Sequence, residues 1–197
     1  MDFSKINKAF EERDFGFKYF DTKEDASDYL LSEIQGTTVG LGGSMTLKDM
    51  GLYEKLSGQN QVSWHWIDKV SGKKMASEAK VYIMSANGIS KTGEIINIDG
   101  AGNRASAMLY GHERVYIVAG VNKLEDSYED ALWRARNIAA PKNARRLKAD
   151  TPCALKGDRC YDCRSPQRIC RGIVTLLERP LDIEHMEIVL INEDLGY

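Results

Sequence analysis

Short apolar runs alternate along the chain with segments whose apolar residues recur at helical spacing. The runs 81–85 and 115–119 are almost wholly apolar, which is typical of strands covered on both faces. Segment 127–139, by contrast, has the periodicity of an amphipathic helix. This alternation predicts an α/β fold in which a mostly parallel sheet carries helices on both faces.

The same patterns set the expected order of the elements. We expect strands at 17–20, 37–41, 62–67, 81–85, 94–99, 115–119, 173–178 and 187–192, and helices at 4–13, 22–36, 47–56, 73–79, 103–110 and 127–139. A polar loop should join 81–85 to 94–99, and Pro141 should break or kink the helix before it. No repeat or linker interrupts the pattern. The sequence therefore predicts one domain, residues 1–197, with a four-cysteine loop at 151–171 inserted before the last two strands.

Composition places the chain among ordinary globular proteins. Its 197 residues are 43% hydrophobic and 28% charged, and no apolar run approaches the roughly 20 residues of a membrane helix. The N-terminal segment has acidic residues and no apolar core, unlike a secretory signal. We therefore expect a cytoplasmic protein without a membrane partner.

Charge is distributed unevenly along this chain. Segment 134–171 carries a net charge of +8, whereas the whole chain carries −2. Such asymmetry indicates an anionic ligand, cofactor or nucleic acid near the basic segment. The alternative is that these side chains fold back onto the acidic remainder.

Residues 37–47, TTVGLGGSMTL, place a glycine-rich turn between a strand and a helix. Glycines let a backbone approach an anion closely, helix N-terminal N–H groups attract it, and hydroxyls add donors. This pattern predicts an anion cradle made of Gly40, Gly42, Gly43, Ser44 and Thr46. It matches neither a Walker motif nor the Rossmann fingerprint, so nucleotide binding does not follow from it. The alternative is a tight turn with a Ser or Thr cap.

Polar residues are dense in segment 85–104, SANGISKTGEIINIDGAGNR, where strand ends should build a site. The candidates are Asn87, Thr92, Glu94, Asp99, Asn103 and Arg104. Glu94 or Asp99 could transfer protons, while Arg104, together with Lys123, could orient an anion. The alternative is two solvated loops with an Asp-Gly turn.

All four cysteines, Cys153, Cys160, Cys163 and Cys170, fall within segment 151–171. Their central Cys-x-x-Cys spacing suits two thiolates on one metal, and a four-thiolate set fits zinc or an iron–sulfur cluster. Zinc ribbons usually pair two such knuckles, so a single one favours the cluster. Reduced thiols or a Cys160–Cys163 redox pair are the alternatives. None of the three histidines has a ligand-like spacing, and His112, in a turn, should be exposed.

Four motifs in order carry a family resemblance: TVGLGGSMTL, ANGISKTGEIINIDGAGNR, VYIVAGVNK and RNIAAPKNARR. Together they resemble the LUD-domain, or lactate-utilisation, family, and the cysteine segment looks like a short cysteine-containing subset of it. The resemblance implies a fold similar to the superfamily of glucosamine-6-phosphate deaminase, ribose-5-phosphate isomerase and CoA-transferases. In those enzymes a glycine-rich loop holds phosphate and a neighbouring acid transfers protons. One departure is Gly88, where alanine is expected.

The resemblance also implies a function. It points to the oxidation of lactate to pyruvate, as an accessory or complex component beside iron–sulfur and oxidoreductase subunits, with a small anionic metabolite as ligand. The superfamily makes a homodimer plausible. One alternative is an isomerase-like or acyl-transfer enzyme in which the cysteine loop is structural. Another is a metal-stabilised module for nucleic acid or protein, which the scarcity of aromatics among the basic residues disfavours for nucleic acid.

Overall fold

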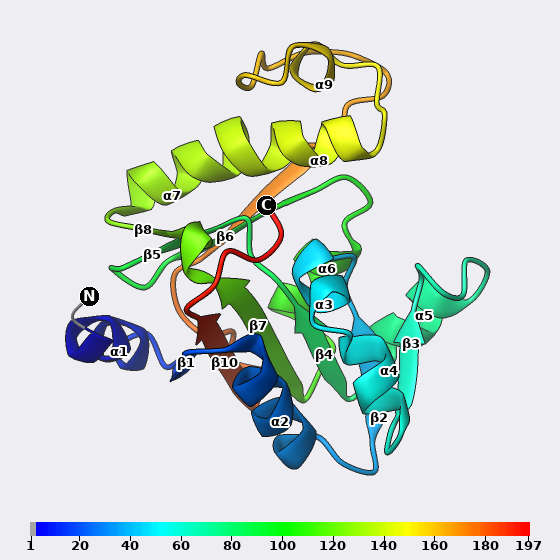
Figure 1. Ribbon diagram of the computed structural model, residues 1–197, viewed down its shortest axis with the longest axis vertical. Helices are drawn as coiled ribbons and strands as arrows, with labels where there is room; N and C mark the ends of the chain where they lie inside the picture. The colour runs from blue at the N-terminus through cyan, green and yellow to red at the C-terminus, as the bar shows by residue number, and fades with distance from the viewer. Residues whose placement is uncertain (1–2) are drawn as a thin grey trace.

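A six-stranded sheet forms the centre of the structure, a computed structural model that describes residues 3–197 (Figure 1). Residues 1 and 2 of the predicted domain lie outside the described residues. The strand order is β1 (Gly16–Phe20), β10 (His185–Ile191), β7 (Arg114–Gly120), β4 (Val81–Met84), β2 (Thr38–Leu41) and β3 (Gln61–Trp64). Each neighbouring pair runs parallel. The predicted α/β fold with a mostly parallel sheet is therefore confirmed.

Alternating side chains of the central strands pack into two separate cores, one on each face of the sheet. Tyr82 and Met84 of β4 face one core, and Val81 and Ile83 face the other. The first core is covered by α1 (Phe3–Glu11) and α6 (Asn103–Leu109), the second by α2 (Lys23–Glu33) and α4 (Leu52–Ser57). Burial on both faces explains why these strands are continuously apolar in sequence.

A second sheet of four strands lies beside the first, and the sequence did not predict it. Its order is β8 (Leu124–Glu125), β5 (Gly88–Ser90), β6 (Ile95–Asp99) and β9 (Gly172–Leu176), with β6 antiparallel to both β5 and β9. The expectation of a polar loop after β4 is therefore wrong, since it contains β5. The strands expected at 94–99 and 173–178 exist, but they belong to this separate sheet.

Two helix predictions also need correction. The helix expected at 47–56 is divided into α3 (Met45–Asp49) and α4, because Gly51 between them has a φ of +64°. Pro141 does not end its helix: α7 (Tyr128–Arg134) continues through the π-helical η2 (Ala135–Ala139) into α8 (Ala140–Arg146). The wider π-helical turn lies directly before the proline, where an ordinary turn would clash with its ring.

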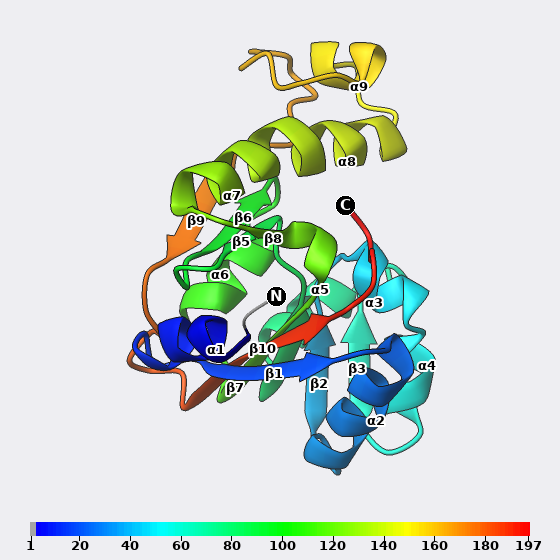
Figure 2. The same cartoon turned by 60° about the vertical axis from the view of Figure 1, so that its left-hand side comes forward.

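The long helical run α7–η2–α8 lies across the second sheet, and the cysteine segment with α9 (Pro152–Lys156) lies beyond it (Figure 2). Ala131 and Ala135 of this run pack on Ile96 and Ile98 of β6. His112 is buried rather than exposed, because its Nδ1 hydrogen-bonds the carbonyl oxygen of Ala79 at 2.7 Å. None of the helices in the described part of the chain combines the length and apolar character needed to cross a membrane.

Candidate functional site

A cavity of about 430 Å³ opens at the carboxyl ends of the parallel strands, and α8 forms one of its walls. Its walls come from the loops after β2, β3, β4 and β6, from η1 (Val121–Lys123) after β7, and from α8 and the cysteine segment. The chain passes from β2 outward to β3 and then returns to β4 on the other side of β2. Open α/β sheets place their ligands at such a reversal of strand order.

The glycine-rich loop contributes only part of the predicted cradle to this cavity. Gly43 and Ser44 line it, whereas Gly40, Gly42 and Thr46 do not. A side chain at Gly40 would collide with the carbonyl oxygen of Ala76, where α5 (Gly72–Ser77) crosses β2. Ser44 Oγ accepts a hydrogen bond from the backbone N–H of Leu47 at 3.3 Å and so caps the single turn of α3. The local geometry is that of a capped turn, and Gly40 serves the close packing of α5 against β2.

Lys123 lies at the floor of the cavity with only 3% of its surface exposed. Its Nζ donates hydrogen bonds to Ser85 Oγ at 2.7 Å and to Thr46 Oγ1 at 2.8 Å. Burial, together with the positive charges of Arg134 and Arg104, lowers its pKa to about 7. Lys123, predicted to contact the ligand, therefore lines the cavity. Thr46 does not line it and influences the site only by accepting a hydrogen bond from Lys123.

Arg104 and Asp99 both line the cavity. Most of their hydrogen bonds are to neighbouring protein groups. The Asp99 carboxylate accepts hydrogen bonds from the backbone N–H groups of Ala101, Arg104 and Ala105 at 2.8–3.1 Å. Burial would raise the pKa of Asp99, but the charge of Arg104 and these backbone hydrogen bonds lower it. The Arg104 guanidinium donates to Asn97 Oδ1 and to the carbonyl oxygen of Ile98. Asp99 therefore anchors the start of α6 as a carboxylate.

Of the remaining predicted residues, Asn87 and Asn103 line the cavity and Thr92 and Glu94 do not. Glu94 instead forms an ion pair with Arg13 and accepts hydrogen bonds from the hydroxyls of Ser90 and Thr92. Burial would raise its pKa, but the two hydroxyl hydrogen bonds and Arg13 lower it. These contacts satisfy the Glu94 carboxylate within the protein and connect the residue before β6 to the turn after α1.

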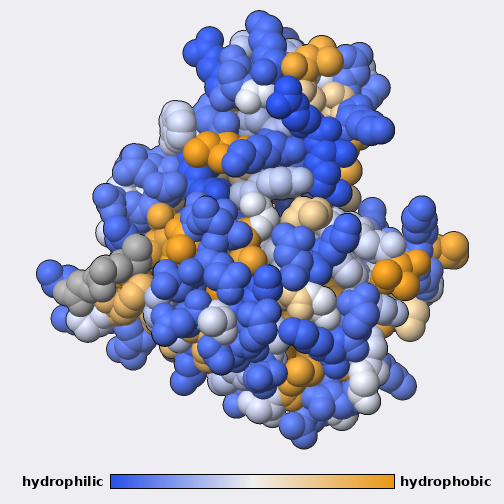
Figure 3. All heavy atoms as spheres, in the orientation of Figure 1, coloured by the Kyte–Doolittle hydropathy of each residue, from blue (hydrophilic) through white to orange (hydrophobic). Residues whose placement is uncertain are grey.

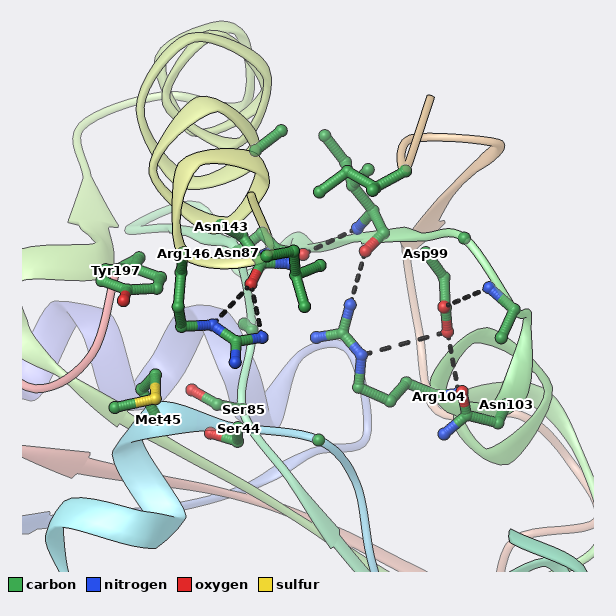
Figure 4. A pocket seen from close by; sticks show the side chains of 18 of the residues that line it. Ser44, Met45, Ser85, Asn87, Asp99, Asn103, Arg104, Asn143, Arg146 and Tyr197 are labelled. Atoms are coloured by element: carbon green, nitrogen blue, oxygen red, sulfur yellow. Dashed lines mark hydrogen bonds and ion pairs between the residues drawn. The ribbon is translucent and has the colours of Figure 1, made fainter. Parts of the chain in front are cut away.

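Two further cavity residues were missed from the sequence. Arg146 of α8 lies over the ring of Trp66, 5.1 Å from its centroid, and points into the cavity opposite Arg104 (Figure 4). Its Nε and Nη2 both donate to Asn143 Oδ1, and Nη1 has no hydrogen-bond partner in the described part of the chain. His65 also lines the cavity, and its Nδ1 is buried without a partner among the described residues. Arg146 thus offers an unsatisfied N–H donor beside the cavity, whereas the unpartnered His65 Nδ1 is enclosed by protein atoms.

The four cysteines line a second, much smaller cavity between α8 and segment 151–171. All four are half-buried, and they form no disulfide within the described residues. Arg168 holds the segment by donating to the carbonyl oxygens of Cys163 and Cys170, both at 2.8 Å. The surface over this part of the molecule is predominantly hydrophilic (Figure 3). Within residues 3–197, no three His, Cys, Asp or Glu side chains are grouped so that they could hold a metal ion as they stand.

A parallel sheet with a polar, cationic crevice at the carboxyl ends of its strands is the arrangement in which open α/β domains place their ligands. The LUD-domain family model matches residues 3–191, so the chain belongs to this family, which is associated with lactate utilisation. The fold is also similar to the crystal structure of a DUF162 family protein from Deinococcus radiodurans, with a TM-score of 0.53 and 10% identity over 97% of this chain and 99% of that one. A search of curated proteins gives no match. The broader superfamily named above stays a prediction.

Proposed function

We propose that this protein binds a small carboxylate of the lactate and pyruvate kind in the 430 Å³ cavity. The observation that carries the proposal is a group of cations from separate elements around one crevice: Arg104, Lys123 and Arg146, together with Arg168 and Arg171 of the cysteine segment. Amide groups of Asn87 and Asn103 and the hydroxyls of Ser44 and Ser85 add neutral hydrogen-bonding groups (Figure 4). Cations surrounded by such groups suit a small acid that also carries a hydroxyl or carbonyl oxygen.

Within lactate utilisation, we assign the chain the role of a ligand-binding component in the oxidation of lactate to pyruvate. Separate redox subunits would then carry out the electron transfer, since the sequence has neither a flavin nor a nicotinamide fingerprint.

Calorimetric titration with lactate and with pyruvate tests the binding proposal. Arg146→Gln should weaken binding about 10- to 100-fold, as expected for a lost charged hydrogen bond of about 1.5–3 kcal/mol. Arg145→Gln is the matched control, because Arg145 is exposed on the same helix and does not line the cavity. Unaltered affinity in Arg146→Gln, or no binding of either acid to the wild type, would refute the proposal.

The cysteine cavity supports a second part of the proposal, a metal centre on four thiolates. Cys153, Cys160, Cys163 and Cys170 all line one small cavity, and four thiolates are the donor set of an iron–sulfur cluster or zinc, although the side chains would have to move closer together to bind it. The backbone N–H of Asp162 already donates to Cys160 Sγ at 3.4 Å, as hydrogen bonds to metal-bound sulfur do.

Metal analysis and visible absorption of protein purified without oxygen test this second part. Iron with sulfide and broad visible absorption identify a cluster, and one colourless zinc per chain identifies a zinc site. Either should be lost in Cys163→Ser and kept in Arg164→Gln, whose exposed side chain lies outside the cavity. Protein without any metal, also after anaerobic reconstitution, would overturn the metal centre and leave the anion site standing.

A further inference from the structure

Lys123 is a buried amine without a carboxylate partner. Within the described residues it forms no ion pair with any Asp or Glu, and Asp49 is the acid whose charge acts on it from a distance. Buried lysines are rare unless they are paired, because removing an ammonium group from water is unfavourable. An unpaired lysine at the floor of a cavity is therefore a candidate for chemistry.

The hydroxyl groups beside Lys123 fix how its nitrogen is oriented. Thr46 Oγ1 donates its hydrogen to the carbonyl oxygen of Leu195 at 3.2 Å, and Ser85 Oγ donates to Thr46 Oγ1 at 3.4 Å. Both hydroxyl oxygens must therefore accept hydrogens from Nζ. Two positions on the nitrogen are occupied in this way, and the third remains without a partner. In the neutral amine that third position is the lone pair.

Neutral amine is available at physiological pH. Burial, with the charges of Arg134 and Arg104, lowers the pKa of Lys123 to about 7, so about half of the molecules carry the lone pair at that pH. Such an amine is a competent nucleophile, whereas an exposed lysine is almost entirely protonated.

The ligand proposed for this cavity supplies a matching electrophile. A 2-oxo acid has a carbonyl carbon next to its carboxylate, and Arg104 and Arg146 line the same cavity as Lys123. A carboxylate held by these guanidinium groups would bring the neighbouring carbonyl into the space that Lys123 faces. His65 lines the same cavity and adds a further polar side chain to its wall.

We propose that Lys123 forms a reversible imine with the carbonyl carbon of a 2-oxo acid such as pyruvate, an inference that rests on the proposed function for the bound acid. The Nζ lone pair attacks C2, a carbon–nitrogen bond forms, and the carbonyl oxygen becomes a hydroxyl. That hydroxyl then leaves as water, with both hydrogens of the amine ending on it. No electrons are exchanged with a third group. Ser85 Oγ, 2.7 Å from Nζ, can relay the proton to the departing oxygen.

Reductive trapping tests this inference. The full-length protein is incubated with pyruvate and sodium borohydride, digested, and analysed by peptide mass spectrometry. We expect one reduced pyruvyl group per chain, on the peptide that contains Lys123. Lactate in place of pyruvate should give no adduct, since it has no carbonyl. Because the modified lysine is located in the wild-type protein, the result does not depend on a variant that folds.

Two variants sharpen the result. Lys123→Arg should lose the adduct, and Lys91→Arg should keep it, because Lys91 lies outside the cavity in an ion pair with Asp126. Absence of an adduct, or adducts spread over surface lysines, overturns the imine. Calorimetric titration of pyruvate separates this failure from that of the proposed function: binding without trapping rejects the imine alone, and absence of binding rejects both.

Discussion

Replacing Lys123 with methionine should stabilise the protein, and by an amount that depends on pH. The side chains are similar in length, and the Thr46 and Ser85 hydroxyls keep their hydrogen bonds to Leu195 and Thr46. What disappears is the need to bury an amine whose pKa falls from 10.5 to about 7 on folding. Loss of that amine removes an unfavourable contribution to folding.

The magnitude follows from linkage. Between pH 7 and 10.5 the unfolded lysine holds a proton that the folded one has lost, so wild-type stability rises by about 1.4 kcal/mol per pH unit. Below pH 7 both states are protonated, and the full penalty of about 5 kcal/mol is present and constant. The advantage of Lys123→Met should therefore be greatest below pH 7 and shrink by about 2–3 kcal/mol between pH 7 and 9.

Urea unfolding followed by tryptophan fluorescence at pH 6, 7, 8 and 9 measures this difference. Comparison with the variant at each pH cancels the titration of all other groups. Lys91→Met, which removes a half-exposed lysine, should follow the wild type across the range. A constant free-energy difference between wild type and Lys123→Met at every pH would refute the reasoning, because it would mean that Lys123 has an ordinary pKa in the folded state.

Three further predictions concern neighbouring residues. Gly40→Ala should lower the free energy of unfolding by about 1–3 kcal/mol in urea titrations, because the added methyl meets the carbonyl oxygen of Ala76; unchanged stability would contradict the close approach of α5 to β2. Glu94→Gln should destabilise by about 1 kcal/mol through the loss of its charged contact with Arg13 and leave pyruvate affinity unchanged in calorimetry. A tenfold fall in pyruvate affinity would instead indicate that Glu94 contributes to the binding site. Arg104→Ala should weaken binding of pyruvate by roughly 1.5–3 kcal/mol, and unchanged affinity would remove Arg104 from the ligand's contacts.

The main sheet could be predicted because its strands are buried on both faces and are therefore apolar without interruption. β4 and β7 stand out in this way, and the Thr22 cap of α2 is equally visible in the sequence. β5 was missed since three residues, Gly88–Ser90, are too few to show any periodicity. The helix continues through Pro141 instead of breaking, because a π-helical turn relieves the clash, a solution that no local sequence rule indicates.

The sequence predicted that the glycine-rich loop and segment 85–104 would contribute to one site. It did not predict that Arg146 of α8 would line the same cavity. Arg146 lies on a helix about a hundred residues away from the glycine loop, and only the tertiary fold brings it over Trp66. Glu94 and Asp99 are alike in sequence, yet one pairs with Arg13 outside the cavity and the other caps α6 at its wall. Spacing identifies polar residues at strand ends, but their partners decide whether they face a ligand.

The two cavities share part of their lining: Ala140, Arg168 and Ile169 contribute to both. A group that displaces these residues on one side necessarily changes the shape of the other. If a loaded metal centre tightens the binding of a small acid by some factor, the acid must tighten the retention of the metal by the same factor. The concentration of the acid would then help to set how much of the protein carries metal, so the wall between the cavities would make the domain a sensor of its own ligand.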